Sequence, residues 1–109
     1  MTETLRTYYV YYIGHYSTDK CYIGITRQGL EVRFLQHLSL ARIHKTYGKS
    51  NATLSRLLFN FDDETDPAYI EPLEILENVS LSNALKRERE IINFNAARCV
   101  NYKPTLTNL

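Results

Sequence analysis

The sequence predicts an α+β fold, with a small central antiparallel β-sheet of about three strands flanked by helices in the order ββααβα. Two observations carry this prediction. Runs of β-branched and aromatic residues at 8–13 and 21–26 are typical of strands. Over 30–45 the apolar residues recur at intervals of three and four, which is typical of an amphipathic helix. Because the 109 residues contain no internal repeat and no linker, we expect a single domain over 1–109.

The first two strands are expected to pair as a β-hairpin with a longish loop. Gly14 closes the first strand, and the polar cluster 17–20 supplies the turn. Gly24 lies inside the second strand, where the missing side chain indicates that another element or a ligand approaches the backbone closely. Successive side chains of a strand point to opposite faces, so Tyr11 is expected to face away from Tyr12.

Two helices are expected after the hairpin. The first covers about 30–45, and the second, over 52–61, is shorter. The polar, glycine-containing stretch 47–51 separates them. The buried face of the first helix is predicted to consist of Leu30, Phe34, Leu38 and Ala41.

A third strand and a third helix complete the predicted fold. Residues 69–79 read as a strand, in which Pro72 indicates an edge position or a start after that residue, because proline cannot donate to a ladder of hydrogen bonds. The third helix covers about 82–95, with Ser80 or Ser82 as its N-cap.

Composition narrows the class of protein. The apolar residues make up 44% of the chain and the charged residues 23%, which is ordinary for a soluble globular protein. No apolar run approaches the roughly 20 residues that span a bilayer, and residues 1–6 lack the features of a signal peptide, so no membrane partner is expected. Cys21 and Cys99 form neither a CxxC motif nor a metal-ligand spacing. An intracellular setting is expected, cytoplasmic or, in a eukaryote, nuclear, and a pairing between the two cysteines stays open.

Charge is distributed unevenly, although the net charge is only +1. Between Lys20 and Arg56 there are seven basic residues and one acid, Glu31, whereas Asp62 to Glu77 contains seven acids and no base. The basic region is suited to phosphate, although a solvated helix face without a partner is the more frequent explanation of such a run. The candidate nucleic-acid contacts are Lys20, Arg42, Lys45 and Lys49.

Two positively charged or chargeable side chains are neighbours on the first helix. Arg33 and His37 lie four residues apart, so their Cβ atoms are about 5–6 Å apart at the edge of the buried face. A phosphate between them would relieve the repulsion of two cationic groups. The alternative is a salt bridge of Arg33 beside a surface histidine.

Glu88 falls within the apolar stripe of the third helix, which consists of Ala84, Leu85, Ile91 and Ile92. A carboxylate in such a place is costly unless it is paired or bound to a metal. An ion pair with an arginine and a helix cap are two structural explanations. The third is an oxygen ligand for Mg²⁺, which typically takes one or two protein carboxylates and completes its shell with water and phosphate.

These residues together resemble the pattern of the GIY-YIG endonuclease superfamily. Residues 10–13 stand for the first motif, 22–24 are an intact YIG, and Tyr11 and Tyr22 are eleven residues apart as in the family. The first motif lacks its glycine, since Tyr9 stands in that place. The resemblance covers about residues 7–104, which would be the core of the domain. Its remaining positions are Arg33, His37, Glu88 and Asn101.

The resemblance implies a DNA endonuclease that hydrolyses phosphodiester bonds with Mg²⁺ or Mn²⁺. Tyr11 would act as general base or orient the attacking water, and Tyr22 would support it by hydrogen bonding. A free tyrosine has a pKa near 10, so a basic Tyr11 at neutral pH requires a lowered pKa, for which Arg33 is the candidate cause, or a metal-bound water as the source of the proton.

The resemblance also assigns the other roles. Arg33 would stabilise the pentacovalent phosphate with its planar fork of donors, and His37 would relay or orient a proton. Glu88 would hold the metal ion. Asn101 would support the site without contacting the reacting groups.

Two other readings remain open at this point. One is a non-catalytic nucleic-acid-binding module on the same scaffold, which the missing glycine favours. The other is a protein-interaction domain of unrelated fold, which leaves the partly buried Glu88 and the Arg33–His37 pair unexplained. Family members often carry a separate targeting domain, for which these 109 residues leave no room, so a homo-oligomer or a separate targeting partner is an open expectation.

Overall fold

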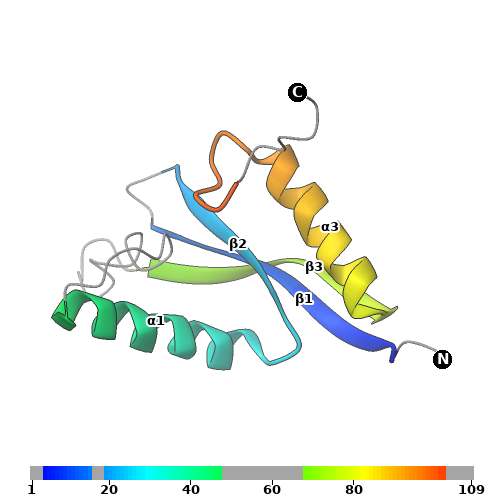
Figure 1. Cartoon of the computed structure of the whole chain (residues 1–109), viewed down its shortest axis with the longest axis horizontal. Coiled ribbons are helices and arrows are strands. Elements are labelled where there is room, and N and C mark those ends of the chain that lie inside the picture. The colour runs from blue at the N-terminus through cyan, green and yellow to red at the C-terminus, as the bar shows by residue number, and fades with distance from the viewer. Residues whose placement is uncertain (1–3, 16–18, 48–67, 103–109) are drawn as a thin grey trace.

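The computed structural model describes residues 4–15, 19–47 and 68–102, without the side chains of 44–47. The chain forms a three-stranded antiparallel sheet with two helices, an α+β fold as predicted (Figure 1). The predicted helix over 52–61 lies outside the described residues. The elements are β1 (Arg6–His15), β2 (Cys21–Thr26), α1 (Leu30–Tyr47), β3 (Ala68–Val79) and α3 (Leu81–Phe94).

The strands lie in the order β2-β1-β3, so β1 is central and both neighbours are antiparallel to it. Tyr11 of β1 pairs with Gly24 of β2, and Ile13 pairs with Tyr22. Pro72 lies on β3, an edge strand, opposite Tyr11 and at an irregularity in the register. The edge position that the proline predicted is confirmed.

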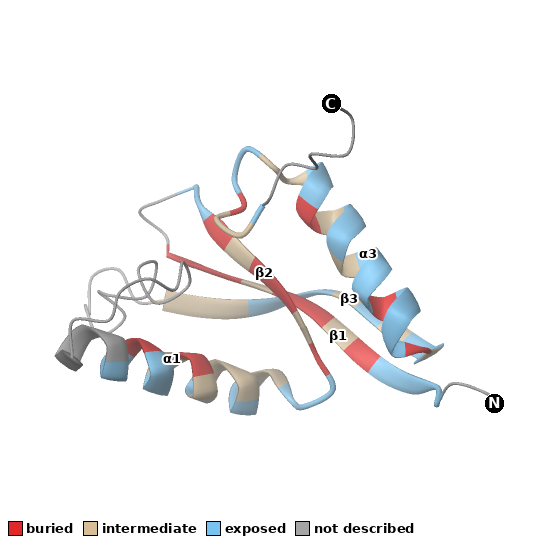
Figure 2. Ribbon diagram, in the orientation of Figure 1, coloured by how far each residue is buried: buried red, intermediate tan, exposed pale blue. Residues whose placement is uncertain are grey.

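The two helices cover opposite faces of the sheet, because alternate residues of β1 pack against different helices. Tyr11 and Ile13 form a buried cluster with Ala41 of α1, whereas Val10 packs with Ile23 and with Ile92 of α3. Figure 2 shows this buried band along β1 and β2 with the helices on either side. The predicted separation of Tyr11 from Tyr12 is confirmed, since Tyr12 packs on the α3 side.

The first helix buries the face that its periodicity predicted. Leu30, Phe34 and Leu38 pack against the cluster around Tyr11, and the helix extends two residues beyond the predicted end at 45. The exposed side chains of α1 include four apolar ones, Val32, Leu35, Leu40 and Ile43.

The third helix begins at Ser80, whose hydroxyl accepts a hydrogen bond from the backbone N–H of Asn83 at 3.2 Å. This settles the N-cap in favour of Ser80 over Ser82. Leu85 was expected in the apolar stripe, but it is 45% exposed. Ala84 and Ile92 are buried and Ile91 packs beside them, whereas Leu85 lies at the edge of this buried face.

After α3 the chain returns to the sheet beside β2. The Cys21 N–H donates to the Arg98 carbonyl at 2.9 Å, and the Val100 N–H donates to the Cys21 carbonyl at 2.8 Å. Cys21 and Cys99 thereby face each other across an isolated parallel bridge, with both thiols free and buried. Within the described part of the chain, no helix has the length and apolar character needed to cross a membrane.

Candidate functional site

The hydroxyl of Tyr11 is the centre of a buried polar cluster between β1 and α1. It lies 2.8 Å from Nε2 of His37 and accepts a hydrogen bond from Nε of Arg33 at 3.3 Å. The single helical turn between Arg33 and His37 presents both side chains to the same strand. The structure therefore brings together three of the residues that the sequence singled out.

Gly24 makes this arrangement sterically feasible. A Cβ atom built on Gly24 would lie 2.5 Å from the Tyr11 oxygen and 2.6 Å from Cζ of the same ring. The close approach that the glycine predicted is confirmed, and the approaching group is the phenol of the neighbouring strand. Glycine is therefore required at position 24, because the Tyr11 ring occupies the space that a Cβ atom would fill.

Replacing Gly24 by alanine is expected to displace the Tyr11 ring and to destabilise the fold by about 1–3 kcal/mol, which is the usual cost of overpacking a core. The urea midpoint should fall with an unchanged slope, and the Tyr11–His37 hydrogen bond should be lost from NMR spectra of the imidazole. Gly29→Ala is the matched control, because an added Cβ there meets nothing within 4 Å. Equal effects of the two substitutions would contradict this packing account.

Tyr22 completes the aromatic surroundings of His37. Its ring meets the imidazole edge-on, with centroids 5.6 Å apart, and the Tyr11 ring lies 6.0 Å from the imidazole on a tilted plane. The resemblance implied a hydrogen bond from Tyr22 to Tyr11. Among the described residues Tyr22 instead contacts the cluster through the His37 ring.

Burial decides the protonation states of the cluster. It raises the pKa of Tyr11 to about 12 and outweighs the hydrogen bond from Arg33, which acts in the opposite direction. Burial, followed by the charge of Arg33, lowers the pKa of His37 to about 4. At neutral pH Tyr11 is therefore a phenol and His37 a neutral ring. Of the two routes to a basic Tyr11, a pKa lowered by Arg33 is not found in the free protein, and a metal-bound water as the source of the proton stays a prediction. The repulsion between two cations does not arise, because His37 is neutral.

One hydrogen-bond direction follows from these charges: Arg33 can only donate to the Tyr11 oxygen. The direction of the Tyr11–His37 bond depends on the His37 tautomer. In the tautomer that carries its proton on Nδ1, the phenol donates to Nε2, and Tyr11 then connects a guanidinium to an imidazole lone pair that accepts its proton.

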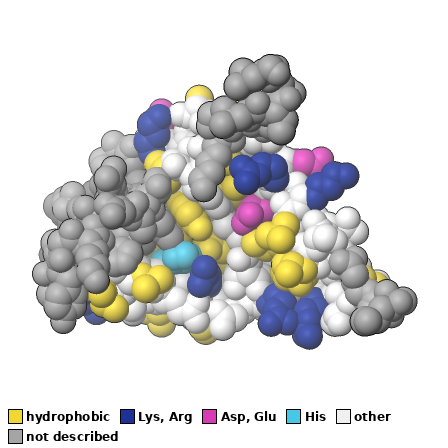
Figure 3. Space-filling view, viewed as in Figure 1, with side chains coloured by type: hydrophobic (Ala, Val, Ile, Leu, Met, Phe, Trp, Pro, Cys, Tyr) yellow, Lys and Arg dark blue, Asp and Glu magenta, His cyan; other side chains and the backbone are white. Residues whose placement is uncertain are grey.

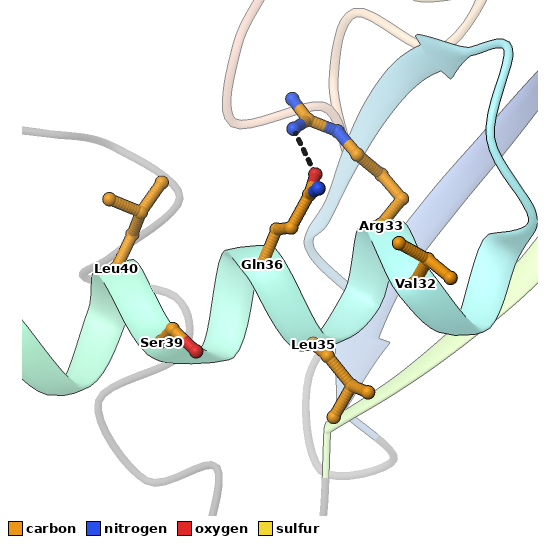
Figure 4. A pocket seen from close by; sticks show the side chains of 6 residues that line it. All are labelled: Val32, Arg33, Leu35, Gln36, Ser39 and Leu40. Atoms are coloured by element: carbon orange, nitrogen blue, oxygen red, sulfur yellow. Dashed lines mark hydrogen bonds between the residues drawn. The ribbon is translucent and has the colours of Figure 1, made fainter.

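A second nitrogen of Arg33 donates to a residue that the sequence did not single out. Nη1 of Arg33 donates to Oε1 of Gln36 at 3.0 Å, as Figure 4 shows. Spacing alone could have identified Gln36, since residues three apart on a helix are neighbours. A shallow depression on the surface of α1 lies beside the pair, lined further by Val32, Leu35, Ser39 and Leu40.

Glu88 approaches the cluster from α3 and is half-buried between Ala84 and Ile92. Burial raises the pKa of its carboxyl group, against a smaller opposing effect of Arg89. Its negative charge contributes to the raised pKa of Tyr22 and of Tyr11, so it acts on the same site. The face between the two helices in Figure 3 carries a histidine, basic side chains and an acidic side chain close to one another.

The two structural explanations of Glu88 find no partner in the described residues. Ser80 is the cap of α3, and the ion pairs of that helix join Arg87 to Glu74 at 2.7 Å and to Glu90 at 3.8 Å. Within the same residues Glu88 has neither an ion pair nor a side-chain hydrogen bond.

The donor set limits which metal ion could bind. The described residues contain no group of three or more histidine, cysteine, aspartate or glutamate side chains that could enclose an ion. One carboxylate fits Mg²⁺ or Mn²⁺, which accept oxygen ligands and retain several waters, better than it fits Zn²⁺, which takes three or four protein ligands.

Asn101 lies behind the site and holds β2 by both of its side-chain atoms. Its Oδ1 accepts from the Ile23 N–H at 3.2 Å, and its Nδ2 donates to the Ile23 carbonyl at 2.7 Å. The thiol of Cys99 also donates to Oδ1 at 2.8 Å. Because Ile23 lies between Tyr22 and Gly24, these bonds position the part of β2 that lines the site.

Two of the four candidate nucleic-acid contacts, Lys20 and Arg42, have side chains that the structure describes. Lys20 donates from Nζ to the Ala97 carbonyl at 2.9 Å, so it fastens the segment after α3 to the hairpin. Arg42 is exposed on α1. The side chain of Lys45 and all of Lys49 lie outside the described residues.

Two arginines that the sequence did not single out, Arg6 and Arg27, lie side by side at the start of β1 and the end of β2. Together they line two adjacent surface depressions, one with Thr4, Tyr8 and Leu81, and the other with Thr7 and Gln28. Neither guanidinium is bonded to another described residue. Only the strand pairing, which the sequence does not specify in this detail, places them together.

Comparisons with protein-family models, with curated proteins and with solved structures find no match for this chain. The family resemblance therefore rests on the residues of the sequence themselves, and the function has to be argued from the geometry of the site.

Proposed function

We propose that the chain is a metal-dependent DNA endonuclease that hydrolyses phosphodiester bonds through a site of the GIY-YIG type. The observation that carries the proposal is the hydroxyl of Tyr11, hydrogen-bonded at once to Arg33 and to His37. Such an oxygen lies next to a cation that binds phosphate and next to a neutral ring that accepts a proton. Phosphodiester hydrolysis requires both functions within reach of one reacting group.

In this proposal Tyr11 is a neutral phenol in the free protein, and during the reaction it transfers a proton from the attacking water to His37. Water that attacks phosphorus loses a proton to the phenol oxygen while the phenol proton moves to Nε2 of His37. A ring with a pKa of about 4 is a weak base before substrate binds. An anionic phosphate beside Arg33 offsets the cationic charge and raises the pKa of His37, which brings it closer to the operating pH.

Arg33 supplies the charge that stabilises the transition state. Its Nε is used by Tyr11 and its Nη1 by Gln36, so the rigid guanidinium is oriented before DNA binds. A planar fork oriented in this way suits the oxygens of a pentacovalent phosphate, on which negative charge accumulates during the reaction.

Glu88 would hold Mg²⁺ or Mn²⁺. The bound ion would neutralise charge on the phosphate and on the leaving oxygen. Support for this assignment comes from the half-buried carboxylate without an ion partner in the described part of α3. Asn101 keeps Tyr22 and Gly24 in place by its two bonds to Ile23.

Cleavage assays in the intracellular pH range test the proposal. The full chain is incubated with supercoiled, linear, flapped and single-stranded DNA, with and without Mg²⁺ or Mn²⁺. We expect metal-dependent strand breaks with at least one of these substrates and none with Glu88→Gln. DNA binding without cleavage under every condition would favour the non-catalytic module, and the absence of both would exclude a nucleic-acid function.

The path of the DNA backbone is proposed to run from the site toward Arg6 and Arg27. Arg27 lies three residues beyond Gly24, about 10 Å along an extended strand, which corresponds to about three nucleotides of axial rise. Two adjacent guanidinium groups without a partner among the described residues are suited to phosphates on either side of them. Arg42 is the proposed contact on the α1 side, and Lys45 and Lys49 stay proposed contacts from the sequence alone.

Neutralising this pair is expected to weaken binding and to flatten its dependence on salt. For Arg6→Gln/Arg27→Gln, the slope of log K against log salt should fall by about 1–2, since each phosphate contact contributes about 0.9. Fluorescence anisotropy with a short labelled duplex measures the slope. Lys86→Gln, an exposed basic residue of α3 outside the two depressions, is the control and should change the slope less. Identical slopes for the double variant and the wild type would remove Arg6 and Arg27 from the path.

A further inference from the structure

We propose that Cys21 and Cys99 are an oxidisable thiol pair whose disulfide fastens the segment after α3 to the strand that lines the site. The two residues lie opposite each other in an isolated parallel bridge, with backbone hydrogen bonds on both sides of Cys21. Both side chains are buried, at 8% and 7% exposure, and they belong to one apolar cluster.

The backbone geometry fits a disulfide without rearrangement of either segment. Directly opposed residues of neighbouring strands have Cα atoms about 4.8 Å apart, and disulfides span Cα distances of about 4.4–6.8 Å. Opposed residues of parallel strands direct their side chains to the same face, and here both thiols enter the same cluster beside Ile23 and Ile92. The distance and the direction therefore both permit bond formation.

The pair is connected to the site through Asn101. The thiol of Cys99 donates to Oδ1 of Asn101, and Asn101 holds both backbone groups of Ile23. In the reduced protein, hydrogen bonds and the apolar packing of Cys99 join residues 98–101 to β2. A covalent bond at Cys99 would fasten this segment two residues from Asn101, while the thiol proton that Asn101 accepts would be removed.

The oxidant is a low-molecular-weight disulfide such as oxidised glutathione. One cysteine thiolate attacks a sulfur of the oxidant, which forms a mixed disulfide and releases one thiol. The second cysteine thiolate then attacks the protein sulfur of the mixed disulfide, forms the Cys21–Cys99 bond and releases the second thiol. The two protons lost by the cysteines are taken up by the two released thiols. Burial raises the pKa of both cysteines, so the exchange should be slow at neutral pH and faster in mild alkali.

The test uses the full chain in glutathione buffers of graded ratio, without DNA. Samples are acid-quenched, alkylated and analysed by peptide mapping. We expect one intramolecular Cys21–Cys99 disulfide and a Tm raised by at least about 5 °C, because the bond closes a loop of about 80 residues in the unfolded chain. Amide exchange at residues 95–102 should slow at least tenfold.

Cys21→Ser and Cys99→Ser are the matched controls, and neither should show a Tm that depends on the redox buffer. The peptide map of the wild type decides the proposal even if a serine variant fails to fold. Both thiols remaining alkylatable at the most oxidising ratio, stable mixed disulfides on separate cysteines, disulfide-linked dimers, or an internal disulfide that lowers Tm would each overturn it. Because no measurement uses DNA or metal, the result is independent of the proposed nuclease activity.

Discussion

Arg33→Ala is expected to lower the single-turnover rate of DNA cleavage about 10³-fold while weakening DNA binding less than about tenfold. Removing a group that stabilises charge only in the transition state typically costs two to three orders of magnitude in rate. The loss should include the orientation of Tyr11, since Nε of Arg33 donates to the phenol oxygen. Rates at saturating DNA and equilibrium binding constants, measured on the same duplex, separate the two effects.

Arg33→Lys should recover little of the rate, because a point charge cannot donate to Tyr11, to Gln36 and to phosphate from one rigid plane. Arg42→Ala is the comparison within the same helix. It should weaken binding and leave the saturating rate nearly unchanged if its exposed side chain contacts only the backbone of the DNA. If Arg33→Ala and Arg42→Ala give the same profile, then Arg33 belongs to the basic surface and the catalytic assignment is wrong.

Glu88→Gln is expected to abolish metal-dependent cleavage, by at least about 10³-fold, while the fold and DNA binding persist. The amide keeps the shape of the side chain but not the charge that holds a divalent ion. The Mn²⁺ affinity of the free protein, measured by electron paramagnetic resonance, should fall in parallel. Glu90→Gln provides the control, since Glu90 is exposed two residues further along α3. Full activity of Glu88→Gln at saturating Mg²⁺ would contradict the assignment.

The same substitution has a predictable effect on stability. Burial raises the pKa of the Glu88 carboxyl above its unfolded value, so the ionised form destabilises the fold at neutral pH, and stability is lost as pH rises through the folded pKa. Glu88→Gln should therefore leave Tm at pH 7 unchanged or raised. It should also lower the pKa of Tyr22 and Tyr11, since the negative charge of Glu88 raises both. A large loss of Tm without metal would indicate an ion pair of Glu88 that stabilises the fold.

Patterns within short segments of the sequence were sufficient to predict most of the described strands and helices. The apolar and aromatic runs at 8–13 and 21–26 became β1 and β2, because a β-branched or aromatic run favours extended backbone wherever the tertiary contacts allow it. Pro72 identified an edge strand, since a missing N–H donor is tolerated only there. Gly24 indicated a close approach before the approaching group was known.

Other features depended on how the elements meet. Leu85 was expected inside and lies outside, because the sheet contacts a narrower line of α3 than the apolar pattern covers. The depressions that Arg6 and Arg27 line together and the bonds of Asn101 to Ile23 bring together segments about 20 and about 80 residues apart. Periodicity describes neighbours within an element and contains no information about such pairs.

The sequence alone determined the class of fold, the element order over the described residues and the residues from which a site could be built. It placed Arg33 beside His37, because residues four apart on a helix are always neighbours. Only the tertiary structure decided that Tyr11 lies between them, and that it is a phenol beside a neutral imidazole. The reason is physical: a pKa depends on the water that a side chain loses and the charges that surround it, and both are set by the packing of β1 against α1.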